Sequence, residues 1–165
     1  MQSSYSTERL ILHDLQLEDH AFITVLVNTP GWIRFIGERY VHSQADAEAY
    51  ITKIMKNPLI HYWVVRLKET GESIGVITFI KRDYLDHYDL GFAFLPEYSG
   101  KGYAFEAACV ILENVKEDKA HEYILATTIR DNFSSIKLVE KLGLKFERSF
   151  ENNGESLLLF SMKIN

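Results

Sequence analysis

The sequence predicts one α/β (α+β) domain spanning residues 1–165, in which about four helices cover a mixed, mostly antiparallel sheet of about seven strands. Three observations lead to this prediction. A chain of 165 residues has the length of one domain and buries about 70% of its unfolded surface. Hydrophobic residues make up 47% and charged residues 25%, as in an ordinary globular protein. Helical and alternating apolar patterns follow one another in the order β-α-α-β-β-β-α-β-α-β-β.

The first part of the chain predicts one strand and two helices. Alternation in "RLILHDLQ" (9–16) indicates a strand, and the helical spacing of "LEDHAFITVLVN" (17–28) predicts a helix that "NTPG" ends. Ser43 can cap a second helix through "SQADAEAYITKIMKN" (43–57). The apolar face expected for that helix is Ala47, Tyr50, Ile51, Ile54 and Met55.

The middle of the chain changes to a period of two. The segments "HYWVVRL" (61–67), "SIGVITFI" (73–80) and "YDLGFAFL" (88–95) are rich in β-branched and aromatic residues, and "KETGES" between the first two has the composition of a hairpin turn. Three strands in series predict an antiparallel meander.

From Gly102 onward the pattern is helical again, followed by a strand, a helix and two strands. One face of the first helix is Ala104, Ala107, Ala108, Ile111, Leu112 and Val115. "HEYILATTI" (121–129) predicts a buried strand, and "NFSSIKLVEKLG" (132–143) a short helix that Asp131 or Asn132 caps and Gly143 ends. "LKFERSF" and "SLLLFSMKI" predict two last strands around the turn "ENNGE".

Composition excludes several classes of protein. The net charge of −5, with both signs interspersed, argues against a nucleic-acid partner. No run of 18 apolar residues predicts a membrane span, and the first 14 residues lack a secretory pattern. The single Cys109 cannot form an intramolecular disulfide and fits a buried structural thiol, so we expect a cytoplasmic protein. We expect no metal, and a homodimer is left open.

Two glycines, Gly100 and Gly102, lie one residue apart just before the clearest helix of the chain. Glycine costs backbone entropy, and its use at a strand-to-helix turn is the close approach of backbone N–H groups to an anion. The helix N-terminus adds about half a positive charge. The turn lacks the full pattern of a P-loop and the third glycine of a dinucleotide fold. It therefore indicates a diphosphate site, although a lone pair of turn glycines is ordinarily just a loop.

The surroundings of this turn resemble GNAT-type acyl-CoA N-acyltransferases. The shared features are a strand ending in "GFAFLP", the turn "EYSGKGYA", the amphipathic helix, a strand, and "NFSSIKLVEKLGLKF". The opening "TERLILHDLQLEDHAF" is similar to the branch that includes ribosomal-protein N-terminal acetyltransferases. The resemblance covers nearly the whole chain. It implies a single-domain GNAT fold and the transfer of an acetyl group from acetyl-CoA to a primary amine, by direct attack in a ternary complex.

The resemblance also implies where acetyl-CoA, the cosubstrate, binds. Its diphosphate is expected on the amides of the glycine turn, and its pantetheine arm is expected to pair with the end of the preceding strand, which Pro96 helps to terminate. The family usually has Gln or Arg at Ser99, so the chain departs from the family there. The residues expected to bind the cosubstrate are Phe92, Phe94, Leu95, Ser99, Gly100, Lys101, Gly102, Tyr103, Ala104 and Asn132.

Acetyl transfer needs a neutral amine, a stabilised oxyanion and a proton for the departing thiolate. Asp89 stands where family members often carry a Glu that acts as base, on the same strand face as Gly91. A surface or salt-bridged carboxylate is an equally good interpretation of Asp89, and His87 is the nearest competitor for the role. Glu106, inside the helix after the turn, is expected to be structural.

For the thiolate, many family members use a Tyr at the position of Val139. The ribosomal-protein branch instead has Ser three residues after the motif Asn, and Asn132 and Ser135 have that spacing. The resemblance thus makes Asp89, Ser135 and Asn132 the candidate catalytic residues, although Asn132 can also be only a helix cap and Ser135 only a first-turn residue.

The acceptor amine is the least defined part of this prediction. In the family, the link between the first two helices helps to wall the acceptor pocket, and the aromatic residues of that link could equally belong to the core. The residues expected to bind the acceptor are Trp32, Phe35, Tyr40 and His87. The acceptor is a protein N-terminal amino group or a small-molecule amine. Two rival functions are a non-catalytic acyl-CoA-binding sensor with a GNAT fold and a purely structural interaction domain.

Overall fold

A computed structural model describes residues 1–165, and its strands form one sheet of eight in the order β1-β2-β3-β4-β5-β6-β8-β7. Every neighbouring pair is antiparallel except β5 and β6, which are parallel. The strands are β1 (Ser4–Ser6), β2 (Leu10–Asp14), β3 (Ile60–Leu67), β4 (Ser73–Ile80), β5 (Asp89–Phe94), β6 (Tyr123–Ile129), β7 (Lys145–Asn152) and β8 (Glu155–Lys163). The mixed, mostly antiparallel sheet and the predicted order of its main elements are confirmed.

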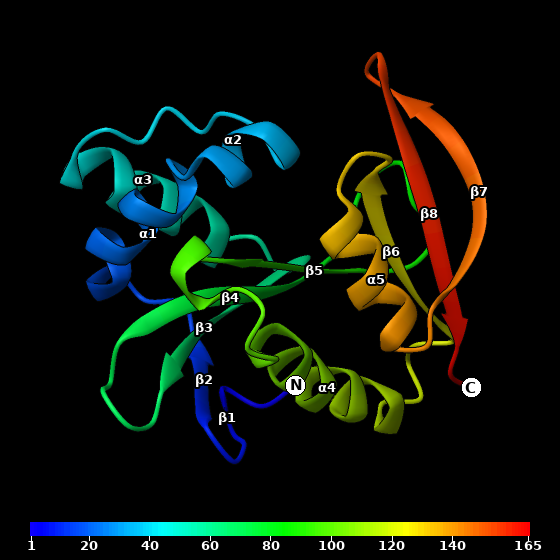
Figure 1. Ribbon diagram of the computed structural model, residues 1–165, viewed down its shortest axis with the longest axis horizontal. Coiled ribbons are helices and arrows are strands. Elements are labelled where there is room, and N and C mark those ends of the chain that lie inside the picture. Colours follow the sequence, from blue (N-terminus) through cyan, green and yellow to red (C-terminus); the bar gives the residue numbers. More distant parts are fainter.

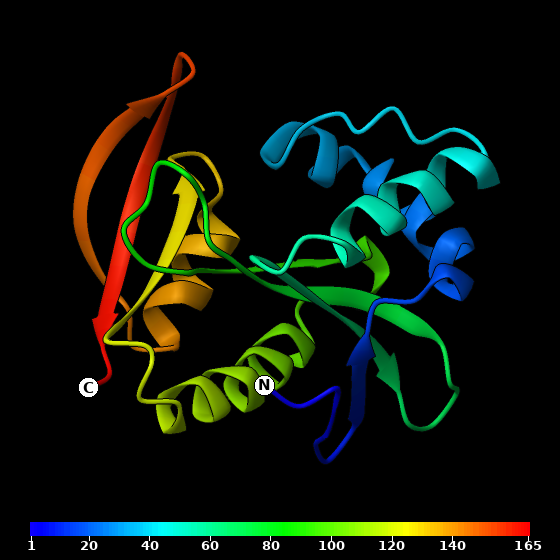
Figure 2. The same cartoon turned by 180° about the vertical axis from the view of Figure 1, so that it is seen from behind.

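Five α-helices accompany the sheet, with two short 3-10 helices. They are α1 (His20–Val27), α2 (Pro30–Phe35), α3 (Gln44–Met55), α4 (Tyr103–Glu117) and α5 (Phe133–Lys141); the 3-10 turns are Leu17–Asp19 and Pro96–Tyr98. Helices α1, α2 and α3 gather on one face of the sheet, and α4 and α5 lie on the other (Figure 1, and from behind in Figure 2).

Two elements were missing from the predicted order. The first is β1, only three residues long, which pairs with β2 and is too short to show a period in the sequence. The second is α2, which begins within "NTPG": the Thr29 hydroxyl accepts the N–H of Trp32, and Pro30 occupies the first helical position. Proline is favoured there because its missing N–H would have no partner in any case. The prediction of "NTPG" as only a helix end was therefore incomplete.

The core consists of two large layers separated by the sheet. One cluster of 20 buried residues packs α4 and α5 against strands from β1 to β8. It includes all of the predicted helix face except Ala104, which is only half-buried; the others are Ala107, Ala108, Ile111, Leu112 and Val115. A second cluster of 12 packs α1, α2 and α3 against the other face. Ser43 caps α3 as predicted, but Met55, which was expected on its buried face, is exposed. It is the last residue of the helix.

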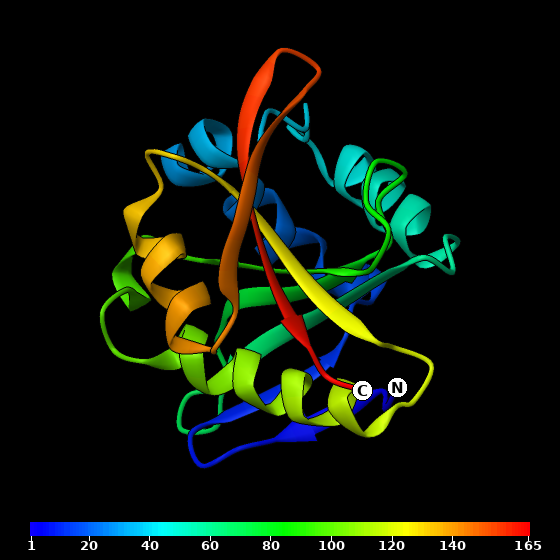
Figure 3. The same cartoon turned by 90° about the vertical axis from the view of Figure 1, so that its right-hand side faces the viewer.

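The β7–β8 hairpin extends beyond the rest of the sheet (Figures 1 and 3). Asn152 pairs with Glu155, so the turn consists of Asn153 and Gly154 alone, both with positive φ. Such a turn matches the natural twist of a hairpin. The structure has no helix with the length and apolar character needed to cross a membrane.

Candidate active site

The parallel strands β5 and β6 separate almost as soon as they meet. They share a single residue pair, Asp89 with Leu125, whereas β5 pairs with β4 along its whole length. From Leu90 to Phe94 the edge of β5 that faces β6 therefore has no strand partner. Unpaired strand edges offer backbone N–H and C=O groups to any extended chain that can lie beside them. The wedge between β5 and β6 is thus a place where an extended ligand can add like a strand.

Asp89 lies at the closed end of this wedge, and both of its carboxylate oxygens are engaged. Oδ1 accepts the backbone N–H of Thr127 at 3.0 Å, and Oδ2 accepts Nε of Arg82 at 2.5 Å and the Thr127 hydroxyl at 3.3 Å. Asp89 is only 2% exposed. Burial raises the pKa of its carboxyl above the ordinary value, against the lowering effects of Arg82 and Thr127. The structure thus gives Asp89 a salt bridge and a position beside the wedge at the same time.

The glycine turn lies at the other end of β5, at the start of α4. Gly100 and Gly102 have φ of +72° and +80°, a backbone conformation that favours glycine. None of the backbone N–H groups of Gly100, Lys101, Gly102, Tyr103 and Ala104 donates a hydrogen bond within the protein. Together with the α4 N-terminus they form a row of free donors at the positive end of a helix dipole, which is a favourable arrangement for an anion.

The last residues of β5 alternate between the two faces of the sheet. Phe92 and Phe94 contact the cluster under α4, while Ala93 and Leu95 contact the cluster under α1 and α3. Gly75 on β4 leaves room for Phe94, since a Cβ on Gly75 would come within 2.4 Å of the Phe94 ring. Pro96 opens the short 3-10 turn that leads, through the exposed Ser99, into the glycine turn.

The first turn of α5 places Asn132 and Ser135 near the end of β6. Asn132 is the cap of the helix: its side-chain oxygen accepts the backbone N–H of Ser135 at 3.3 Å. The Ser135 side chain is half-buried, and its hydroxyl makes no hydrogen bond within the protein, so it is free to donate. Ser134 is exposed, and Val139 is buried in the core. Of the two predicted caps for this helix, Asn132 is the one that acts.

The four residues expected around the acceptor lie in different environments. Trp32 is buried in the cluster of α1, α2 and α3, which fits the alternative of a core aromatic. Phe35 is half-buried at the end of α2, and Tyr40, with a positive φ, is 76% exposed. The His87 ring lies 5.1 Å from that of Tyr123, at the beginning of β6 and so at the closed side of the wedge.

Sequence reasoning missed three residues that the structure brings to Asp89 and its surroundings. Arg82, in the loop before β5, pairs with Asp89, and Thr127 lies across on β6. Tyr62 on β3 has its pKa raised well above the ordinary value by burial and by the neighbouring Tyr50, whose hydroxyl is 3.5 Å away. No local pattern singles these residues out, because each acts through a partner on another strand or helix.

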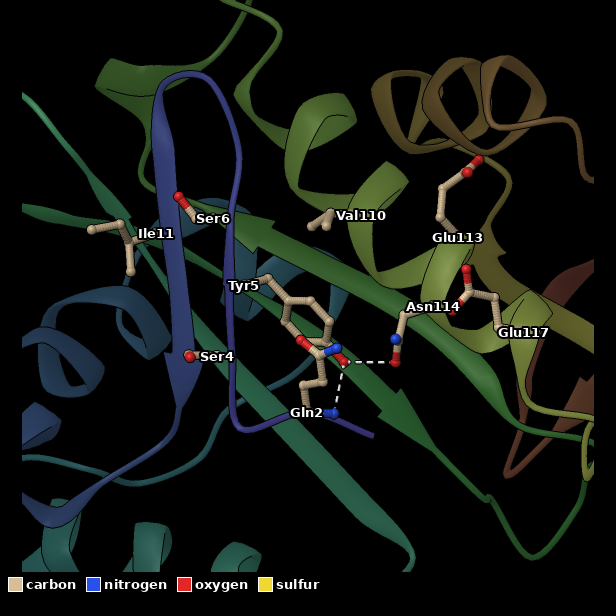
Figure 4. Close-up of a pocket in the computed structure, with 9 residues that line it drawn as sticks. All are labelled: Gln2, Ser4, Tyr5, Ser6, Ile11, Val110, Glu113, Asn114 and Glu117. Atoms are coloured by element: carbon tan, nitrogen blue, oxygen red, sulfur yellow. Dashed lines mark hydrogen bonds between the residues drawn. The ribbon is translucent and has the colours of Figure 1, made fainter.

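A separate hollow lies between β1 and the outer face of α4 (Figure 4). Its polar groups largely satisfy one another: Tyr5 accepts the N–H of Gln2 and donates its hydroxyl to Asn114 at 2.8 Å. Glu113 and Glu117 place negative charge beside the C-terminal half of α4, which disfavours an anion. This hollow is therefore a poorer candidate than the glycine turn at the opposite end of the same helix.

Comparisons with known proteins agree with this geometry. Residues 9–145 match the family model described as an acetyltransferase (GNAT) domain. A Bacillus subtilis protein named as an uncharacterized N-acetyltransferase, YnaD, is 31% identical over 147 residues, which cover 88% of this chain and 85% of that protein. A ribosomal-protein-S5-alanine acetyltransferase from Vibrio fischeri superimposes with a TM-score of 0.83, at 20% identity, over 99% of this chain and 98% of that one. A spermidine N-acetyltransferase from Vibrio cholerae, solved with CoA and spermine, has a TM-score of 0.79 at 21% identity and covers 96% and 97% of the two chains.

Proposed function

The chain belongs to the GNAT acetyltransferase family and is an N-acetyltransferase, and from this premise we propose that it transfers the acetyl group of acetyl-CoA to a primary amine held in the same ternary complex. The acceptor is a protein N-terminal amino group or a small-molecule amine.

The row of free amides from Gly100 to Ala104 is the observation that carries this proposal. A diphosphate accepts several N–H donors at once, and helix α4 directs its positive end at the same place. From there the unpaired edge of β5 leads along the wedge to Asp89. A cofactor with a diphosphate at one end and an extended amide-bearing arm at the other fits both features, and CoA is such a molecule. The proposed binding residues are those of the turn together with Phe92, Phe94, Leu95, Ser99 and Asn132.

The chemistry proposed for the closed end of the wedge uses two side chains. An ammonium group must lose a proton before it can attack the thioester, and Asp89, with its pKa raised by burial, is the proposed acceptor of that proton, directly or through a water. The collapse of the tetrahedral intermediate releases a thiolate, and the free hydroxyl of Ser135 is the proposed donor near the sulfur. Asn132 holds the helix end that carries Ser135.

The acceptor class is supported from two sides. The solved relatives include one enzyme named for a ribosomal protein and one for spermidine, so the fold serves both protein and small-molecule amines. In this chain Phe35, Tyr40 and His87 are the accessible residues among those proposed to line the acceptor pocket.

An acetylation screen tests the proposal. The purified protein is incubated with acetyl-CoA and a panel of N-terminal peptides, polyamines and amino acids, and thiol release is followed together with the mass of each acceptor. We expect amine-dependent thiol release and a gain of one acetyl group on at least one acceptor. Tight CoA binding without turnover across the panel would instead support the acyl-CoA sensor, and an absence of CoA binding would overturn the proposal.

A further inference from the structure

Arg9 links the beginning of the chain to the glycine turn through its backbone N–H and its guanidinium. Its backbone N–H and its Nε both donate to Glu106, at 2.9 and 2.7 Å, and Nη1 donates to the backbone carbonyl of Lys101 at 2.9 Å. The guanidinium also lies over the Tyr103 ring, with Cζ 4.4 Å from its centre. All three partner residues belong to the glycine turn or to the first turn of α4.

The bond to Lys101 determines the direction in which the next amide points. In a trans peptide the carbonyl and the following N–H point to opposite sides. Because Arg9 holds the Lys101 carbonyl, the N–H of Gly102 points away from Arg9, to the side on which the amides have no protein acceptor. A Cβ added to Gly102 would lie 3.4 Å from Nη2 of Arg9, so the guanidinium also lies close to Gly102 itself.

Arg9 also neutralises a carboxylate that would otherwise oppose an anion. Glu106 lies in the first turn of α4, close to the free amides. Its carboxylate accepts the Thr7 hydroxyl at 2.6 Å as well as the two donors of Arg9. Partial burial raises the pKa of Glu106, but the bonds from Thr7 and Arg9 outweigh it and hold the pKa below the ordinary value. The negative charge is therefore paired, and the helix end keeps its attraction for phosphate.

We propose that Arg9 is a positioning residue for the cofactor, which preorganises the Lys101–Gly102 peptide so that its N–H group meets the diphosphate of CoA. This inference rests on the proposed function. Two glycines with positive φ leave the exposed turn free to adopt other conformations, and a turn that is already held loses less entropy when the ligand binds. Arg9 acts through the backbone and does not need to touch the ligand.

The test measures the dissociation constant of CoA by calorimetry and the kinetic constants for the full-length protein and three variants. Arg9→Ala should weaken CoA binding about tenfold, as expected for the loss of a partly exposed charge-assisted hydrogen bond. The turnover rate at saturating acetyl-CoA should stay unchanged. Arg9→Lys keeps the charge but cannot bond Glu106 and Lys101 as a fork, so it should bind CoA nearly as weakly as Arg9→Ala.

Lys68→Ala is the matched control. Lys68 is exposed, and its side chain donates to the carbonyl of Thr7, which lies in the same loop as Arg9. The Lys68 side chain makes no hydrogen bond or ion pair with the glycine turn or with Glu106. Its loss should leave CoA affinity at the wild-type value. Dephospho-CoA should show the same weakening by Arg9→Ala as CoA does, because the diphosphate is common to both. Circular dichroism checks that each variant is folded. If Arg9→Ala does not fold, Arg9→Lys serves as the test.

Three outcomes would overturn the inference alone. They are wild-type affinity in a folded Arg9→Ala or Arg9→Lys protein, an equal loss in Lys68→Ala, and an effect of Arg9→Ala that disappears with dephospho-CoA. The first outcome would show that CoA binding does not require the bonds from Arg9 to the turn. The second would show that a positive charge near this loop is enough to explain the effect. The third would show that Arg9 binds the 3′-phosphate of CoA directly. A wild-type protein that does not bind CoA would overturn the proposed function and this inference with it.

Discussion

The Asp89 carboxylate accepts the backbone N–H of Thr127 at 3.0 Å. Thr127 lies two residues beyond Leu125, which forms with Asp89 the only residue pair that joins β5 to β6. A side chain thus takes the place of a main-chain carbonyl at the point where the parallel ladder ends. The two strands can diverge there without leaving the partly buried N–H of Thr127 unsatisfied, which would cost free energy. Asp89 therefore both ends the pairing of β5 with β6 and lies at the closed end of the wedge. For this reason Asp89 is the first residue to mutate.

Asp89→Asn should lower kcat by about 10²-fold or more if the carboxylate takes the proton of the amine. The pKa of Asp89 is raised by burial, so in the wild type the rate should increase with pH as this group ionises, and the variant should lose that acidic limb. The measurement is the pH profile of kcat for both proteins. Full activity of Asp89→Asn at every pH, combined with a loss in His87→Ala, would assign the role to His87; no effect in either would leave the proton to bulk water.

Gly102→Val should raise the dissociation constant of acetyl-CoA strongly, by about 10²-fold. A β-branched residue is strained at a φ of +80°, so the turn would change conformation and its amide N–H groups would no longer point at the diphosphate together. Gly71→Val is the matched control: Gly71 has φ of +74° in the β3–β4 turn and no atom within 4 Å of an added Cβ. It should cost similar stability and leave CoA binding intact. Unchanged CoA affinity in a folded Gly102→Val protein would refute the diphosphate site.

Ser135→Ala should lower kcat by about 10²-fold or less while the affinity for acetyl-CoA changes little, since a thiolate is a good leaving group and needs only partial assistance. Ser134→Ala provides an internal control, because Ser134 is exposed and points about 100° away on the helix. Steady-state kinetics of both variants decide the question. If the two variants behave alike, or if Ser135→Ala changes only cofactor affinity, the thiolate leaves with help from solvent.

Glu106→Gln should destabilise the protein at neutral pH by about 1 kcal/mol, less than is usual for hydrogen bonds to a charged group because Arg9 is partly exposed to solvent. The pKa of Glu106 is lower in the folded protein than its ordinary value of 4.5. Its stabilising contribution is therefore complete above about pH 4.5 and is lost as the pH falls through the folded pKa. Urea unfolding of wild type and variant should converge toward low pH. A difference that stays constant from pH 7 to pH 3 would contradict this assignment.

The periodic elements could be predicted because their signals are local. The helical spacing of residues from Ala107 to Val115, the Ser43 cap and the positive-φ glycine after α5 all involve residues within about one or two turns of each other. The same holds for the glycine turn, whose backbone conformation follows from Gly100 and Gly102 themselves. Strand β1 and helix α2 were missed because a short element shows no period of its own.

The sequence by itself thus determined the class of fold, the order of its main elements and the turn that marks the candidate cofactor site. The tertiary structure alone decided what holds these parts in place. Arg9 and Glu106 are 97 residues apart in the chain, and Asp89 and Thr127 are 38 apart. Such pairs leave no periodic signal, because their side chains meet only after the sheet has brought their strands and helices together. Hydrogen bonds and ion pairs depend on distance in space, whereas sequence patterns report only the period and the caps of each separate element.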